Sequence, residues 1–129
     1  MFGHSPMFWL EISADCPKTG CKERNSYGKG PVIRTGAVER LFKTYSNLYG
    51  DLSANSAYSA ISRDPEYGLE FLDTYQDRLC FATDTTSKRS NSQLAQYLES
   101  CIAEGKLSRS AYEKICYKNA IRVFGLPSQ

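Results

Sequence analysis

Short apolar runs alternate with amphipathic helices along this chain, and that alternation restricts the fold more than any other feature. The clearest run covers residues 79–84 (LCFATD), which is typical of a buried strand that stops at a carboxylate. Side chains at the carboxyl ends of parallel strands line the functional face of α/β proteins, so Asp84 is the first candidate for a functional residue. An isolated Asp before Thr85 and Thr86 more often caps a turn or a helix, and that alternative stays open.

The other elements follow from residue spacing and from helix start signals. Apolar side chains recur at helical intervals in 36–47, and Asp64 followed by Pro65 is a strong helix start. The predicted order is strand 1–3, a helical turn at 8–12, loop 13–35, helix 36–47, strand 48–53, helix 64–76, strand 79–84, and two helices near 94–105 and 108–125. Strands that alternate with helices in this way predict right-handed crossovers and a parallel sheet.

The length of 129 residues allows one hydrophobic core, so we expect a single domain over 1–129 with a long functional or mobile loop at 13–35. Three strands are few for a parallel sheet, because each edge needs a neighbour. The sequence therefore predicts an α/β fold that is the last third of something larger, with Met1 as an internal methionine.

Composition argues against several classes of function. A net charge of +2, from 16 basic and 14 acidic residues, gives no basic stripe for nucleic acid. No apolar run approaches the roughly 20 residues of a membrane span, so we expect no membrane partner. The apolar opening 1–10 contains Gly3 and Pro6 and has no basic leader, unlike a secretory signal, and we expect a cytoplasmic protein.

Several isolated residues admit more than one interpretation. The five cysteines match no disulfide framework, and we expect free thiols, although Cys16 and Cys21 could hold a metal with His4. His4 is the single histidine of the chain and follows a short strand, where a lone His is more often structural than catalytic. Asp51 either faces the same pocket as Asp84 or bonds a neighbouring strand end, and the second is favoured.

A series of short motifs runs through nearly the whole chain: GHSP at 3–6, FW at 8–9, KGPV at 29–32, NLYGDLSA at 47–54, SRDP at 62–65, YQDRL at 75–79, FATD at 81–84, NA at 119–120 and FGL at 124–126. In this order and spacing they resemble the carboxyl-terminal part of the amidohydrolase-2 type of metal-dependent hydrolase. The resemblance implies strands six to eight and the final helices of a (β/α)₈ TIM barrel, which is incomplete in this chain.

The resemblance also implies a chemistry, which is hydrolysis or non-oxidative decarboxylation of a small-molecule substrate with a divalent metal, often zinc. His4 would stand at the end of the sixth strand and Asp84 at the end of the eighth, and both are candidate metal ligands and catalytic residues. His4 would orient the activated water or the substrate, and Asp84 would bind the metal and carry the proton. Trp9, Lys29 and Arg63 are candidates for substrate binding, because an aromatic side chain can wall a pocket and a cation can pair with a carboxylate. Each is also compatible with packing or with a surface position.

The chain departs from the family pattern in ways that bear on activity. Members contribute a His-x-His pair and a further His from strands that this chain lacks, and two ligands are fewer than the three of catalytic zinc. We therefore expect a fragment that is inactive on its own and does not bind a metal tightly. The alternatives are a subunit that completes its barrel with a partner chain or as a homo-oligomer, and a small non-catalytic domain.

Overall fold

The computed structural model describes residues 1–15, 27–85, 87 and 92–127. In chain order its elements are β1 (Phe2–Gly3), α1 (Pro6–Leu10), α3 (Ala37–Thr44), β2 (Tyr49–Leu52), α4 (Ala54–Ser62), α5 (Pro65–Thr74), η1 (Gln76–Arg78), β3 (Leu79–Phe81), α6 (Gln93–Ala103), α7 (Arg109–Glu113), η2 (Lys114–Lys118) and α8 (Asn119–Phe124). The mixed α/β class predicted from the sequence is confirmed.

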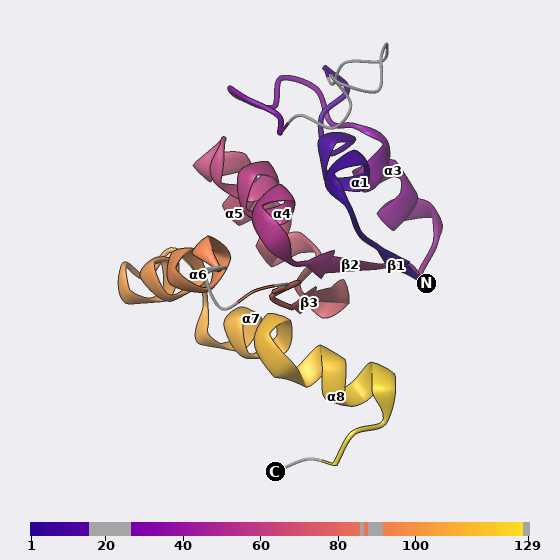
Figure 1. Ribbon diagram of the computed structural model, residues 1–129, viewed down its shortest axis with the longest axis vertical. Coiled ribbons are helices and arrows are strands. Elements are labelled where there is room, and N and C mark those ends of the chain that lie inside the picture. Colours follow the sequence, from indigo (N-terminus) through magenta and orange to yellow (C-terminus); the bar gives the residue numbers. More distant parts are fainter. Residues whose placement is uncertain (16–26, 86, 88–91, 128–129) are drawn as a thin grey trace.

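The three strands form one parallel sheet in the order β1-β2-β3. Phe2 lies opposite Tyr49, and Asp51 lies opposite Cys80, so the carboxyl ends of all three strands meet at one edge. In Figure 1, α4 and α5 lie above this sheet, whereas α7 and α8 lie below it. The predicted parallel pairing is confirmed, but each strand is shorter than the sequence suggested, and β3 ends at Phe81 rather than at Asp84.

The core lies between the sheet and the helices packed against it, and it includes side chains from α1 through η2. Its largest fully buried side chains include Trp9 from α1, Phe42 from α3, Leu52 from β2 and Leu72 from α5. A Cβ at Gly50 would lie 2.9 Å from a methyl group of Leu79, so the absence of a side chain there lets the neighbouring strand and helices pack closely. Hydrophobic burial of this kind is the main force that holds such a fold together.

Local sequence signals explain why helix α5 was predicted and why helix α4 was not. Asp64 caps α5 by accepting a hydrogen bond from the backbone N–H of Tyr67, and Pro65 occupies the first helical position, as predicted. Helix α4 was not predicted, because its sequence ANSAYSAIS is rich in Ser and Asn, which favour turns and caps. Tertiary packing forms the helix nevertheless, since Ala57, Ala60 and Ile61 are all buried.

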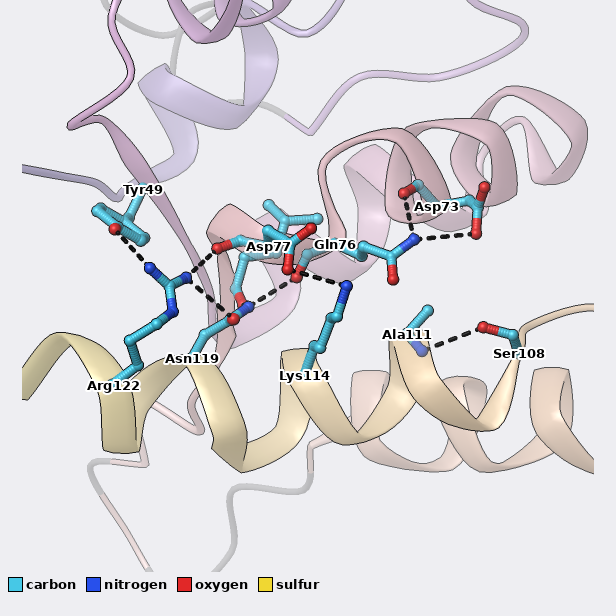
Figure 2. Close-up of polar contacts among 10 residues, drawn as sticks. Tyr49, Asp73, Gln76, Asp77, Ser108, Ala111, Lys114, Asn119 and Arg122 are labelled. Atoms are coloured by element: carbon cyan, nitrogen blue, oxygen red, sulfur yellow. Dashed lines mark hydrogen bonds and ion pairs between the residues drawn. The ribbon is translucent and has the colours of Figure 1, made fainter. Parts of the chain in front are cut away.

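The predicted last helix consists of α7, a five-residue π-helical segment and α8 in direct succession. Figure 2 shows side chains of this helix pointing toward the amino-terminal ends of the strands. Asn119, which is 2% exposed, donates from its amide to the backbone oxygens of Gln76 (2.6 Å) and Leu79 (2.8 Å). Lys114 pairs with Asp77 at 2.9 Å. These contacts fix the helix against the start of β3.

The described parts of the predicted loop 13–35 contain no helix or strand, apart from an isolated antiparallel bridge between Ser13 and Thr35. Val32 donates its backbone N–H to Asp64 at 2.8 Å, which anchors the end of this loop to the start of α5. Residues 16–26, including Cys16 and Cys21, lie outside the described residues. No helix in the described ranges is long and apolar enough to cross a membrane.

Candidate metal and catalytic site

Three polar segments follow the three strands at the carboxyl edge of the sheet. Each contains a residue other than glycine with a positive φ: Ser5 (97°) after β1, Ala54 (55°) after β2 and Asp84 (48°) after β3. Such backbone conformations cost of order 1–3 kcal/mol each and are concentrated at functional sites. These are the positive-φ residues other than glycine in the described parts of the chain, and all of them belong to this one edge.

His4 lies at this edge, directly after the outer strand β1. Its Nδ1 atom lies 2.9 Å from Oδ2 of Asp51 and 3.1 Å from Oγ of Ser53. On the other side of the ring, Nε2 lies 3.8 Å from Oδ2 of Asp84. The structure thus brings together the two residues that the sequence proposed as metal ligands, His4 and Asp84, although they are far apart in the chain.

The gap between His4 and Asp84 is too long for a direct hydrogen bond, whose heavy atoms lie about 2.7–3.2 Å apart. Two donor atoms each about 2.0–2.2 Å from a tetrahedral zinc ion lie about 3.3–3.6 Å apart, which is close to this separation. The imidazole is 44% exposed and the Asp84 carboxylate is 48% exposed, so both are accessible. Residues 1–15, 27–85, 87 and 92–127 contain no group of three or more His, Cys, Asp or Glu that could hold a metal. Metal binding by His4 and Asp84 therefore stays a prediction.

Asp51 and Ser53 are additional members of the site. The sequence analysis favoured a contact between Asp51 and a neighbouring strand end. Asp51 does make such a contact, because His4 directly follows β1. The same contact places Asp51 beside His4 in the candidate site. Ser53, which is 1% exposed, was not singled out from the sequence. The signal that could have found it is its spacing, since residues two apart on a strand point to the same side.

Trp9 is 1% exposed and donates its indole N–H to the backbone oxygen of Asp51 at 3.0 Å. It thus supports the site from the core. Lys29 is exposed in the loop, and the guanidinium of Arg63 lies against Gly28, where an added Cβ would overlap it. Arg63 and Trp9 both line a small internal cavity of about 10 Å³. Substrate binding by Trp9, Lys29 and Arg63 stays a prediction.

The thiol of Cys80 lies beside the site, in register with Asp51. Burial raises the pKa of the Cys80 thiol, and the Asp51 carboxylate acts in the same direction. Because the thiolate is the form that binds metals and attacks electrophiles, a raised pKa disfavours both roles for Cys80. Cys80, Cys101 and Cys116 are free, which confirms the expectation of free thiols for the described cysteines.

Comparison with known proteins adds one match. No curated protein and no solved structure matches the chain. A protein-family model described as Amidohydrolase matches residues 36–126. The matched range includes Asp51, Ser53, Asp84 and Asn119, whereas His4 precedes it. This match covers more than half of the chain and agrees with the motifs found in the sequence, and the chain therefore belongs to the amidohydrolase family.

Proposed function

We propose that the chain forms the last three βα units of a (β/α)₈ barrel in a metal-dependent amidohydrolase, with His4 and Asp84 as two ligands of a divalent metal, zinc in the first instance. The observation that carries this proposal is the 3.8 Å separation of His4 Nε2 and Asp84 Oδ2 at the carboxyl edge of a parallel sheet. That edge is where barrel enzymes place their catalytic groups.

The chemistry of the two side chains suits hydrolysis or non-oxidative decarboxylation. A bound zinc ion supplies Lewis acidity, which makes water a nucleophile near neutral pH. An imidazole can hold a water or a substrate oxygen in place, because it can donate or accept a hydrogen bond. A carboxylate has a second oxygen that can accept a proton, which Asp84 would then carry to the product. The substrate we propose is a small molecule.

The proposal also requires protein beyond these three strands. Catalytic zinc usually has three protein ligands, and the described residues supply two. Among the described residues β1 is paired on one side only, and beside it lies an apolar cavity of about 600 Å³ lined by Met1, Phe2, Gly3, His4, Phe8, Leu41, Tyr45, Asn47 and Leu48. We propose that a further barrel strand, from a longer chain or a partner subunit, lies there. The chain alone is then inactive and binds metal weakly.

Free thiols in the described part of the chain support a cytoplasmic location.

Zinc affinity measured by calorimetry tests the metal proposal. We expect the wild-type chain to bind one zinc ion, and His4→Ala and Asp84→Asn each to weaken binding at least tenfold. Asp73→Asn is a matched control, because Asp73 is an exposed carboxylate on α5, outside the site. Equal affinity in wild type, His4→Ala and Asp84→Asn would refute the metal site and favour a small non-catalytic domain.

A further inference from the structure

We propose that Asp51 is a positioning residue for His4: it holds the neutral imidazole in the tautomer that carries its proton on Nδ1, so that Nε2 presents a lone pair toward Asp84. The sequence comparison assigns no role to Asp51. The tautomer follows from contacts within the chain, whereas its purpose, presenting Nε2 to a metal ion or a reacting proton, rests on the function proposed above.

The contact distance defines the proton position. Oδ2 of Asp51 lies 2.9 Å from Nδ1 of His4, which is a normal hydrogen-bond length. An ionised carboxylate can only accept hydrogen bonds. If Nδ1 carried no proton, two lone pairs would face each other at this distance. The imidazole must therefore donate from Nδ1, and in the neutral ring the other nitrogen, Nε2, is then an acceptor.

The role of Ser53 depends on which tautomer is present. Its hydroxyl oxygen lies 3.1 Å from the same Nδ1 atom. A hydroxyl can donate or accept, so Ser53 can share the Nδ1 proton as a second acceptor, or it can donate to an unprotonated Nδ1. Ser53 is thus compatible with either tautomer, and Asp51 alone selects between them.

The protein holds Asp51 rigidly for this role. Asp51 lies in β2, paired with Cys80 in β3, and its backbone oxygen accepts the indole N–H of the buried Trp9. Its other carboxylate oxygen, Oδ1, is buried and has no hydrogen-bond partner among the described residues. His4 is therefore the hydrogen-bonding partner that the structure places against this carboxylate, and the Cys80 thiol is a second ionisable group near it. A carboxylate that accepts from the remote nitrogen of a histidine is the usual way in which proteins orient metal-binding imidazoles.

The consequence lies on the opposite side of the ring. With the proton on Nδ1, the lone pair of Nε2 and the carboxylate oxygen of Asp84 face a common gap of 3.8 Å, and neither can donate to the other. Two acceptors that face each other are suited to a group that both can bind, which is a cation or a proton donor. By fixing this tautomer, Asp51 leaves two electron-pair donors facing the gap, which are Nε2 of His4 and a carboxylate oxygen of Asp84.

Nuclear magnetic resonance can identify the tautomer directly, because the chain has a single histidine and its ring nitrogens need no assignment against others. In a ¹⁵N-labelled chain, at a pH where the ring is neutral, we expect Nδ1 to have the shift of a protonated nitrogen and Nε2 that of an unprotonated one. Free histidine prefers the opposite tautomer. A wild-type spectrum with the proton mainly on Nε2 would overturn the proposal without any variant.

Variants separate the role of Asp51 from a general structural effect. Asp51→Ala should move the proton to Nε2, since Ser53 can then donate to Nδ1, and should weaken zinc binding about tenfold. Asp73→Asn should change neither quantity. An Asp51→Ala chain that folds and keeps its proton on Nδ1 would overturn the proposal. Loss of the proposed function is distinguishable, because a wild-type chain that binds no zinc but has the Nδ1–H tautomer would refute the metal site alone.

Discussion

At the residue scale, a partly buried carboxylate on α3 has consequences that can be measured. Glu39 in α3 accepts hydrogen bonds from the hydroxyl of Tyr67 (2.8 Å) and from the ammonium group of Lys43 (3.0 Å). Burial raises the pKa of Tyr67 strongly, and the hydrogen bond to Glu39 raises it further. The folded chain therefore keeps the Tyr67 proton at pH values where the unfolded chain has lost it.

This difference predicts a loss of stability in alkali. The unfolded tyrosine ionises near pH 10, whereas the folded one ionises at higher pH, so the native state binds more protons and the free energy of unfolding falls as pH rises above about 10. We expect Tyr67→Phe to reduce this dependence, measured as the change in melting temperature between pH 8 and pH 11. At pH 8 the variant should lose about 0.5–1.5 kcal/mol for its missing hydrogen bond.

Tyr45→Phe is the matched control, because Tyr45 is 54% exposed. It should leave both the stability at pH 8 and the alkaline slope close to those of the wild type. An alkaline slope in Tyr67→Phe equal to that of the wild type would show that Tyr67 does not take part.

At the scale of elements, the carboxyl-terminal helix is the most informative, because a π-helical segment precedes the residue that fastens it to the sheet. Asn119 begins α8 directly after the five-residue η2 and is buried with both of its amide hydrogen bonds directed at backbone oxygens near the start of β3. Arg122 donates to the backbone oxygen of Asp77 in the same region (Figure 2).

We expect Asn119→Ala to destabilise the chain by about 2–4 kcal/mol, since two backbone oxygens lose their donor inside the protein. Asn119→Asp should be at least as destabilising, because a carboxylate cannot donate to a carbonyl. Chemical unfolding monitored by circular dichroism gives both values. Ser110→Ala, an exposed position in α7, should change stability by less than about 0.5 kcal/mol. A small effect of Asn119→Ala would mean that the helix is held mainly by its apolar contacts.

Elements also show what the sequence could and could not predict. Helix α5 was predicted because Asp64 and Pro65 are local signals, and the parallel sheet followed from the alternation of strands and helices. Helix α4 was missed because tertiary burial of Ala57 and Ile61 outweighs weak helix propensity. The proximity of His4 to Asp84 was predicted through a resemblance, whereas the contacts of Asp51 and Ser53 with His4 depend on strand register and loop conformation, which spacing alone does not determine.

At the scale of the whole molecule, the described residues form a parallel sheet of three strands with an apolar cavity beside β1, which supports the proposal that further protein completes a barrel. We expect the native protein in its source to be a polypeptide well above 14.5 kDa, or to be recovered in a complex with another chain. Immunoprecipitation with an antibody against residues 109–124, followed by intact-mass measurement, tests this. A free native chain of 14.5 kDa without a partner would contradict the barrel proposal.

The central claim, that His4 and Asp84 share a divalent metal, is tested most directly by diffraction. Crystals of the chain soaked in zinc should show an anomalous difference peak about 2.0–2.2 Å from both His4 Nε2 and an oxygen of Asp84. In crystals of Asp84→Asn soaked in the same way, the peak should be absent or much weaker. A wild-type map with no peak at this edge of the sheet, or with zinc bound to His4 through Nδ1 instead, would contradict the account.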